Sequence, residues 1–202
     1  MGTNARPHGR AARVRIIGGA WRRRWLPVAS VPGLRPSADA QRETLFNWLQ
    51  PRLPGARVLD LFAGTGALGL EAASRGAASV LLVERNPVAA RQLEVNCRAL
   101  DATQVAVRRD DALRLLAAGC HEIGRGRFDI VFADPPFGRG MTVPVLEQLL
   151  DGGWLAPDAR VYVEQENALD APLGWDILRE RVCGQARGLL LASPLPADHT
   201  AR

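Results

Sequence analysis

The sequence predicts a Rossmann-like α/β fold: a mostly parallel seven-stranded sheet that ends in an antiparallel hairpin, preceded by a small β-hairpin extension. From residue 57 onward, short apolar runs alternate with helical stretches. Such alternation is typical of a parallel sheet with helices on both faces. The last two strand-like runs are joined by only Cys183-Gly184-Gln185. That connection is too short for a parallel crossover, so these two strands must pair antiparallel.

A length of 202 residues suits one hydrophobic core. We expect a disordered basic arm over residues 1–12, a single domain over 13–192 and a flexible tail over 193–202. Within the domain, residues 13–36 form the N-terminal hairpin and a loop, and residues 37–192 form the core.

The first elements are identified by their turn and capping residues. Gly18-Gly19 separates two short apolar runs, which predicts a hairpin with strands at 14–17 and 25–28. Ser37 is a suitable N-cap for a helix that continues to about Gln50. Pro51 follows it and prevents the helix from continuing.

The core elements follow in order. Asn86 and Pro87 provide a cap and a first-turn residue for one helix, and Gly76 ends the helix before it. Strands are expected at 57–61, 79–84, 104–108, 128–133, 160–164, 175–182 and 187–191, and helices at 67–75, 87–100, 112–118 and 142–150.

The charge is positive and unevenly distributed. The formal net charge is +5, and residues 1–25 contain several arginines and no acidic residue. Such a surplus favours an acidic partner, most commonly nucleic acid, although a solvated basic tail is the alternative. The candidate phosphate contacts are Arg15, Arg22, Arg23 and Arg24.

The cysteine and apolar patterns exclude several classes. Three unpaired cysteines and three scattered histidines give no zinc pattern and no disulfide framework, so we expect no metal and a cytoplasmic location. No apolar run approaches the roughly 20 residues that span a bilayer. The basic N-terminus has no apolar stretch of the kind that a secretory signal requires.

A glycine-rich loop follows the first core strand. Residues 60–66 read Asp-Leu-Phe-Ala-Gly-Thr-Gly, and Glu84 lies 20 residues beyond Gly64, at the end of the next strand. Glycines let the chain turn sharply and approach a ligand closely, and Glu84 can accept hydrogen bonds from two ribose hydroxyls. A dinucleotide and S-adenosylmethionine (SAM) both satisfy this pattern.

Asp60 favours SAM, because a carboxylate before the loop would repel a pyrophosphate but suits the ammonium group of a methionine moiety. Asp111-Ala112 follows the third strand, where the Asp111 side chain can accept from an adenine amino group. Asp111 is also a suitable N-cap for the next helix, and both roles are compatible.

A second motif, Asp134-Pro135-Pro136-Phe137, follows the fourth core strand. The exocyclic amine of a nucleobase is a poor nucleophile because its lone pair is delocalised. The Asp134 carboxylate and the Pro135 carbonyl can accept its N–H groups and orient it for transfer of a methyl group. The prolines stiffen the loop, and Phe137 offers a face on which the base can stack. The alternative is a rigid turn with Phe137 in the core.

The carboxylate also favours one base. Guanine presents N1–H and N2–H side by side, and one carboxylate can accept both, whereas adenine presents a donor beside an acceptor. This preference is weak, because adenine-modifying enzymes with Asp at the corresponding position are familiar.

Several runs together give the chain a specific resemblance over residues 13–192. The central two motifs and the sheet ending in a hairpin are the pattern of class I SAM-dependent methyltransferases. The additional runs are Arg15 to Arg22, Gly33 to Ser37 and Arg42 to Leu49. With them, the chain resembles the RsmD-type 16S ribosomal RNA (guanine-N2)-methyltransferases.

The resemblance implies SAM as cofactor and one guanine of 16S rRNA, in an assembled or partly assembled small subunit, as substrate. We expect a monomer. By position, Arg35, Pro36 and Ser37 would close over the methionine part of SAM, and Arg139 would contact phosphate or base unless it is a free surface residue. The predicted catalytic residues are Asp134, Pro135, Pro136 and Phe137; the predicted cofactor residues are Arg35, Pro36, Ser37, Asp60, Phe62, Ala63, Gly64, Thr65, Gly66, Glu84, Arg85, Asp111 and Ala112.

Three alternatives stay open at this stage. A DNA or other RNA amino-methyltransferase shares the central motifs, but a DNA enzyme would usually carry a separate target-recognition segment, for which the chain has no room. A non-catalytic RNA-binding assembly factor could keep the fold, although the intact Asp134 motif speaks against it. A dinucleotide dehydrogenase would use the same glycine loop.

Overall fold

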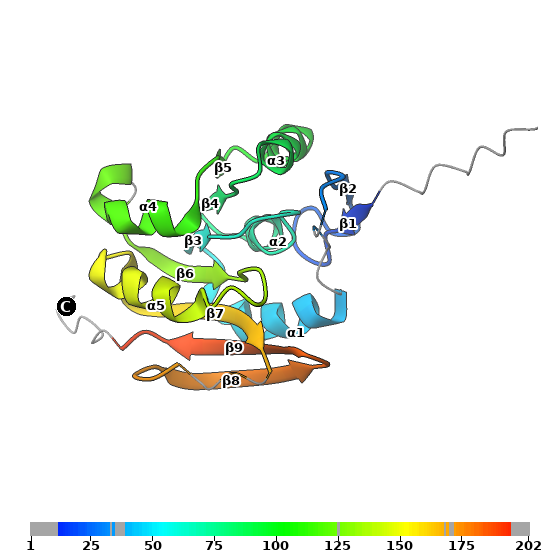
Figure 1. The fold of residues 1–202 in the computed structure, drawn as a ribbon. Coiled ribbons are helices and arrows are strands. Elements are labelled where there is room, and N and C mark those ends of the chain that lie inside the picture. Colours follow the sequence, from blue (N-terminus) through cyan, green and yellow to red (C-terminus); the bar gives the residue numbers. More distant parts are fainter. Residues whose placement is uncertain are drawn as a thin grey trace, which may run out of the picture.

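A computed structural model describes residues 12–32, 34, 39–124, 126–167, 169 and 172–194 (Figure 1). The strands are β1 (Arg13–Arg15), β2 (Trp25–Pro27), β3 (Arg57–Asp60), β4 (Ser79–Val83), β5 (Val105–Arg108), β6 (Phe128–Ala133), β7 (Leu155–Glu166), β8 (Asp176–Cys183) and β9 (Ala186–Ala192). The helices are α1 (Asp39–Leu49), α2 (Gly69–Ser74), α3 (Pro87–Ala99), α4 (Ala112–Ala118) and α5 (Thr142–Asp151), with short 3₁₀ helices η1 (Gln50–Arg52) and η2 (Cys120–Ile123).

The central sheet has the predicted architecture. Its strand order is β5-β4-β3-β6-β7-β9-β8, with β1 and β2 forming a separate antiparallel hairpin. Strands β3 to β7 pair parallel with one another, whereas β9 runs antiparallel to both β7 and β8. From β3 the strands continue through β4 to β5 on one side, and the chain then returns to add β6 on the other side of β3. In open parallel sheets a crevice for ligands lies at such a point, beyond the carboxyl ends of the strands.

Two hydrophobic clusters lie on the two faces of the sheet, and Figure 1 shows the helices that cover each face. On one face, α1, α2, α3 and the β1–β2 hairpin pack against the sheet through residues such as Phe46 and Leu70. On the other face, α4 and α5 pack around Trp154, which is fully buried. The Trp154 indole donates to the Leu116 carbonyl at 3.1 Å, so its polar atom is satisfied within the core.

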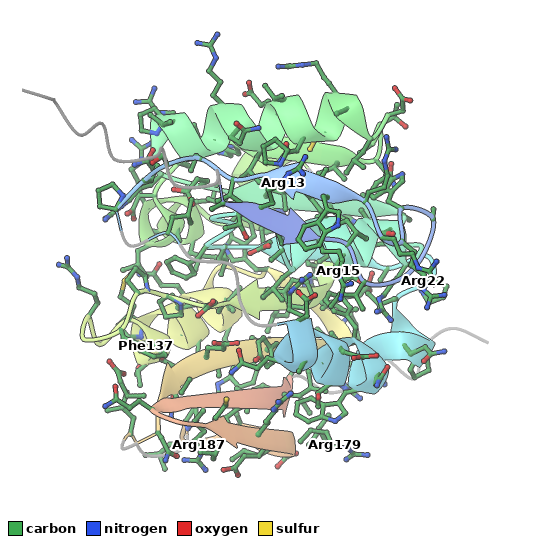
Figure 2. The ribbon with its side chains drawn as sticks, turned by 90° about the vertical axis from the view of Figure 1, so that its right-hand side faces the viewer. Arg13, Arg15, Arg22, Phe137, Arg179 and Arg187 are labelled. Carbon is green, nitrogen blue, oxygen red and sulfur yellow. The ribbon has the colours of Figure 1, made fainter. Side chains whose placement is uncertain are left out.

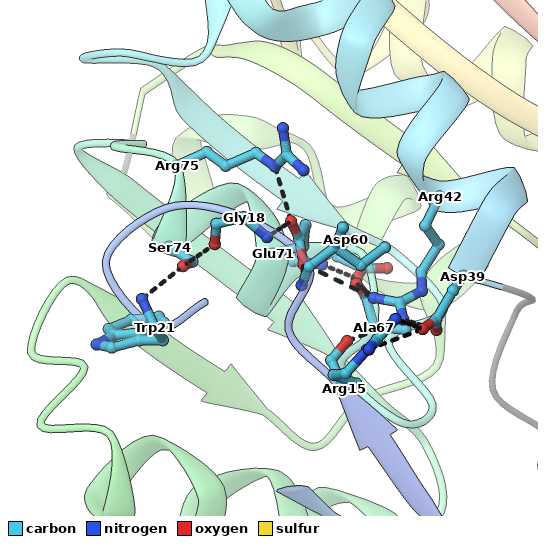
Figure 3. A network of polar contacts seen from close by, with 12 residues as sticks. Arg15, Gly18, Trp21, Asp39, Arg42, Asp60, Ala67, Glu71, Ser74 and Arg75 are labelled. Atoms are coloured by element: carbon cyan, nitrogen blue, oxygen red, sulfur yellow. Dashed lines mark hydrogen bonds and ion pairs between the residues drawn. The ribbon is translucent and has the colours of Figure 1, made fainter. Parts of the chain in front are cut away.

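A buried glutamate ties the N-terminal segment to α2 (Figure 3). Glu71 is fully buried, and its carboxylate accepts the amides of Ile17 and Gly18 at 2.7 and 2.8 Å. It also accepts Nε–H of Arg75 at 2.7 Å. The strand predicted at 14–17 ends earlier, at Arg15. The Ile16 amide still donates to the Arg24 carbonyl at 2.9 Å, but the Ile17 and Gly18 amides turn away to the Glu71 carboxylate.

Arg42, on α1, joins the same network from the opposite side (Figure 3). Its guanidinium is 1% exposed and donates to the Arg15 carbonyl at 2.9 Å and to Asp39 at 2.6 Å. Another of its nitrogens lies 3.7 Å from Glu71. The Gly19 backbone has φ +75°, and a Cβ there would lie 1.8 Å from the Ser74 carbonyl oxygen, so only glycine fits against α2.

Other element boundaries differ from the prediction for local reasons. The helix predicted at 67–75 begins at Gly69, where Asp60 accepts the Gly69 amide at 2.9 Å. Strand β7 begins earlier than predicted, at Leu155, and contains a register shift opposite Phe128/Ile130. The helix cap predicted at Ser37 and most of the predicted arm and tail lie outside the described residues. Ser193, predicted to belong to the tail, donates its amide to Ala159 at 3.1 Å.

The described helices are short or contain many polar residues. Among the described helices, none combines the length and the apolar character needed to cross a bilayer.

Candidate functional site

A cavity of about 530 Å³ lies at the carboxyl edge of the sheet. Its volume is within the range of about 300–1,000 Å³ that is usual for small-molecule sites. Each of the strands β3, β4, β5 and β6 ends at this cavity with an acidic residue just at or beyond its end. These residues are Asp60, Glu84, Asp110 with Asp111, and Asp134. The cavity therefore brings together the two sequence motifs, although residues 67–133 separate them in the chain.

The glycine loop forms one wall of the cavity. Gly64 has φ +51° and lines it, and a Cβ at this position would lie 3.0 Å from the Leu34 side chain. Gly66 has φ +79°, but it does not line the cavity: a Cβ there would meet Leu70 and Leu93 at 2.7 Å. Gly66 therefore allows close packing of the loop against α2 and α3, and its predicted contact with the cofactor stays a prediction.

Glu84 connects the glycine loop to the end of β4. One carboxylate oxygen accepts the Gly64 amide at 2.9 Å, and the other accepts the Asn86 amide at 2.6 Å. Glu84 is half-buried at the cavity wall. A carboxylate has about four acceptor positions, so it can hold the loop and still accept the hydroxyls of a ligand.

Asp60 lies in the floor of the cavity and is only 3% exposed. It accepts the Gly69 amide at 2.9 Å and thereby fixes the start of α2. Burial raises the pKa of Asp60 to about 7, although the backbone hydrogen bonds from Gly69 and Phe62 act in the opposite direction. A buried acid of this kind gains from a cationic ligand, which favours its ionised form.

Two acidic residues, Asp110 and Asp111, follow β5 and make different contacts. Asp111 is the N-cap of α4, because its side chain accepts the amides of Leu113 and Arg114 at 3.1 and 3.2 Å. Asp110 is the more buried of the two and accepts from the guanidinium groups of Arg108 and Arg114. Burial raises the pKa of Asp110, but these hydrogen bonds outweigh it, and the net shift is downward. Both residues line the cavity.

The Asp134 motif forms the opposite wall. Pro135 is buried and Phe137 is 46% exposed at the cavity rim, so the predicted alternative of Phe137 in the core is wrong. Glu166 accepts the amide of Gly138, which ties the loop to the end of β7. In the part of the chain that the structure describes, no donor reaches the Asp134 carboxylate. Burial, then the charges of Glu164 and Asp60, raise the pKa of Asp134 to about 8.

The predicted arginines fall into two groups. Arg139 is exposed and lines the cavity, beside Phe137. Arg15, Arg22, Arg23 and Arg24 lie on or next to the β1–β2 hairpin and do not line it. In Figure 2, Phe137 lies near the left edge and Arg22 near the right edge of the face that is viewed.

The arginines of the hairpin also differ in their contacts. Arg15 donates to Asp39 at 2.8 and 3.1 Å and lies 5.7 Å from the Trp25 ring centroid, so its charge is partly used within the fold. Arg24 donates to the Ala99 carbonyl at 3.3 Å, and Arg22 is exposed. Exposed arginines such as Arg22 are suited to contacts with phosphate.

Some residues of the site could not be identified from the motifs. Val31, Pro32 and Leu34 line the cavity from the loop after β2, and Met141 and Asn86 line it from other loops. Asp110 was missed because its neighbour Asp111 has the clearer capping pattern. The predicted cofactor residues Arg35, Pro36 and Ser37 lie outside the described residues. The other predicted residues Phe62, Ala63, Thr65, Arg85 and Ala112 all line the cavity.

The described side chains include no group of three or more His, Cys, Asp or Glu residues that could hold a metal ion. All three cysteines are free, and two of them, Cys97 and Cys120, are buried.

Comparison with known proteins gives a consistent result. The family described as "Conserved hypothetical protein 95" matches residues 14–191. "Ribosomal RNA small subunit methyltransferase D" of Escherichia coli K12 is 47% identical over 182 residues, which covers 88% of this chain and 89% of that protein. The solved structure of yhhF from Escherichia coli is 45% identical, has a TM-score of 0.81, and is aligned over 93% of this chain and 100% of its own.

A more distant structure shares the fold alone. An RNA methyltransferase from Salinibacter ruber, solved with S-adenosyl-L-homocysteine, is 15% identical with a TM-score of 0.61 and covers 82% of this chain and 97% of its own. The predicted Rossmann-like methyltransferase fold is confirmed, and the predicted cofactor agrees with these comparisons.

Proposed function

The chain belongs to the family described as "Conserved hypothetical protein 95", and from this premise we propose that it transfers a methyl group from SAM to N2 of a guanine in 16S rRNA. The proposed substrate is the small ribosomal subunit, assembled or partly assembled, in the cytoplasm. The relative that carries the name of a small-subunit rRNA methyltransferase supports this choice of RNA.

The residues at the cavity fit SAM. Asp60 can receive the ammonium group of the methionine part, Glu84 the ribose hydroxyls, and Asp111 the adenine amino group. Gly64 lines the cavity without a side chain, and a Cβ there would lie 3.0 Å from the Leu34 side chain, which also lines it. When bound, SAM supplies an electrophilic methyl group attached to a positively charged sulfur.

Residues of the chain then bind the amine and orient it. The Asp134 carboxylate and the Pro135 carbonyl accept the two N2–H groups and direct the nitrogen lone pair toward the methyl group. The methyl group that SAM would supply would be transferred to N2, and the electrons of the former methyl–sulfur bond would remain on sulfur. The N2 proton, now acidic, passes to Asp134 or to water, and Phe137 stacks on the base.

The observation that carries the proposal is the position of the Asp134 carboxylate and its lack of a hydrogen-bond donor among the described residues. Its carboxylate lies at the wall of the same cavity as the glycine loop, and within the described residues it has no donor from the protein. Asp134 is half-buried at this wall, so its carboxylate is accessible from the cavity, and a ligand with N–H groups would supply the donors that it lacks. Arg22 and Arg23 at the β1–β2 hairpin, together with Arg139 at the cavity rim, would bind phosphates.

The test is transfer of tritiated methyl from SAM into small ribosomal subunits, protein-free 16S rRNA and DNA, followed by nucleoside analysis. We expect label in N2-methylguanosine from the subunits. Label only in DNA, or in methyladenosine, would contradict the proposal and favour another amino-methyltransferase.

A single substitution separates the enzyme from an assembly factor. Asp134→Ala should abolish methyl transfer while RNA binding persists, because the carboxylate acts on the amine and lies away from the arginines of the hairpin. If the wild-type protein binds SAM and RNA but transfers no methyl to any substrate, the assembly-factor alternative is favoured.

A further inference from the structure

A second cavity, of about 450 Å³, lies directly beside the first. The two cavities share the motif residues 135–137 and Met141 as a common wall. The far side of the second cavity is lined by apolar side chains, which include Leu146 of α5, Leu169 and Trp175. A concave, mostly apolar site of this volume suits a flat aromatic ligand. The shared wall would place that ligand next to Phe137 and the amine-orienting residues.

The polar residue of interest in the second cavity is Glu164, near the end of β7. Ala133 of β6 pairs with Val163 of β7, so Asp134 and Glu164 follow at the same level on neighbouring strands. Neighbouring strands lie about 4.8 Å apart. Side chains alternate along a strand: Phe132 and Tyr162 belong to one cluster, and Ala133 and Val163 to the other. By this alternation Asp134 and Glu164 share a face.

The fold holds Glu164 in place from one side. The Tyr162 hydroxyl donates to one Glu164 carboxylate oxygen at 2.7 Å. Gly188 of β9 pairs opposite Glu164, and a Cβ at Gly188 would lie 2.5 Å from the Tyr162 hydroxyl oxygen. The glycine therefore makes room for the tyrosine. One oxygen of Glu164 is fixed, and the carboxylate retains capacity to accept from a ligand.

Charge coupling supports the same arrangement. After burial, the charge of Glu164 is the largest cause of the raised pKa of Asp134. Two carboxylates this close repel each other when both are ionised. A ligand that offers two adjacent N–H donors, one for each carboxylate, would relieve this repulsion. The sequence motifs gave no indication of Glu164, because it belongs to neither of them.

We infer, on the basis of the proposed function, that the second cavity receives the target guanine with its Watson–Crick edge at the shared wall, and that Glu164 is its specificity-determining residue. Glu164, which lines the second cavity, accepts N1–H, while Asp134, which lines the first cavity, accepts N2–H. Guanine carries these donors side by side on its Watson–Crick edge. Adenine and 2-aminopurine present an unprotonated N1, whose lone pair would face the Glu164 carboxylate. The site thus selects guanine over both, because with a wrong base the second oxygen of the half-buried Glu164 carboxylate would gain no N1–H donor and would face a lone pair instead.

The test uses the variant Glu164→Gln on two substrates. First, the methylated nucleotide is mapped with the wild-type protein on small subunits. Subunits are then reconstituted with 16S rRNA that carries either guanine or 2-aminopurine at that position, since 2-aminopurine keeps the exocyclic amine at C2 but lacks N1–H. In the variant, the amide oxygen can accept from Tyr162, which turns the amide NH₂ toward N1 of the base.

We expect a crossover in specificity. On guanine, kcat/KM of Glu164→Gln should fall about 10- to 100-fold, because a donor now faces N1–H. On 2-aminopurine the same variant should exceed the wild-type protein. The matched control is Glu94→Gln, the same change at an exposed position of α3 outside both cavities, which should leave both rates unchanged. SAM affinity should be the same in all three proteins.

Three results would overturn the inference. Full activity of Glu164→Gln on guanine would show that Glu164 does not contact the base. An equal loss on both substrates would indicate a merely structural role. A wild-type protein that methylates 2-aminopurine as well as guanine would show that N1–H is not recognised. In each case the wild-type protein still forms N2-methylguanosine; a wild-type protein that forms none would refute the proposed function itself.

Discussion

Removal of the buried Glu71 carboxylate should destabilise the protein strongly. In Glu71→Ala, the amides of Ile17 and Gly18 lose their acceptor, and Arg75 and Arg42 lose a neighbouring negative charge. Arg42 is 1% exposed, so water cannot easily replace the lost partner. Breaking a buried ion pair by removal of one partner costs about 3–5 kcal/mol.

This free energy converts into a measurable change in melting temperature. For a protein of this size, 1 kcal/mol corresponds to about 2–4 °C, so Tm should fall by about 6–20 °C. The assay is thermal unfolding followed by circular dichroism. Glu94→Ala, the same change on the exposed face of α3, is the control and should alter the unfolding free energy by less than about 0.5 kcal/mol.

A second measurement localises the effect. Because Glu71 holds the chain at Ile17 and Gly18, its loss should release the hairpin, and trypsin should cleave at Arg22–Arg24 faster than in the wild-type protein. A Tm within about 2 °C of the wild-type value, with unchanged cleavage, would refute the assignment of Glu71 as the anchor of the N-terminal segment.

Three further outcomes are expected. Burial raises the folded-state pKa of Asp60 from 3.8 to about 7, so its contribution to stability is complete below about pH 4 and is lost as pH rises to about 7. Urea unfolding of the ligand-free protein should therefore show the unfolding free energy falling by up to about 1.4 kcal/mol per pH unit in this range, and Asp60→Asn should not show this fall. Because the pKa of Asp134 is about 8, kcat/KM for SAM should rise with pH until about 8, and a flat profile would contradict its role as the ionised acceptor. Asp111→Ala should cost about 1 kcal/mol by removing the α4 cap, measured by urea unfolding, whereas Asp111→Asn should retain it.

Much of the fold was determined by local signals in the sequence. The alternation of apolar runs with capped helices predicted the parallel sheet, and α4 and β6 begin and end at the predicted residues. The short connection at Gly184 predicted the antiparallel hairpin. These features can be predicted because the spacing of apolar residues, the helix caps and the lengths of the connections each depend on a few consecutive residues. Boundaries failed where a distant group intervened, as at Ile17, whose amide is taken by Glu71.

The candidate site was predictable only in part, for the same physical reason. The glycine loop and the Asp134 motif each follow a strand, and parallel strands bring their carboxyl ends to one edge, so their meeting could be inferred from the sequence. The division of roles between Asp110 and Asp111, the burial of Asp60, and the pairing of Tyr162 with Glu164 depend on neighbours from other strands. Burial and charge coupling are properties of three-dimensional packing. The sequence therefore determined which chemistry the chain carries, and the tertiary structure alone decided which carboxylates meet and how each is held.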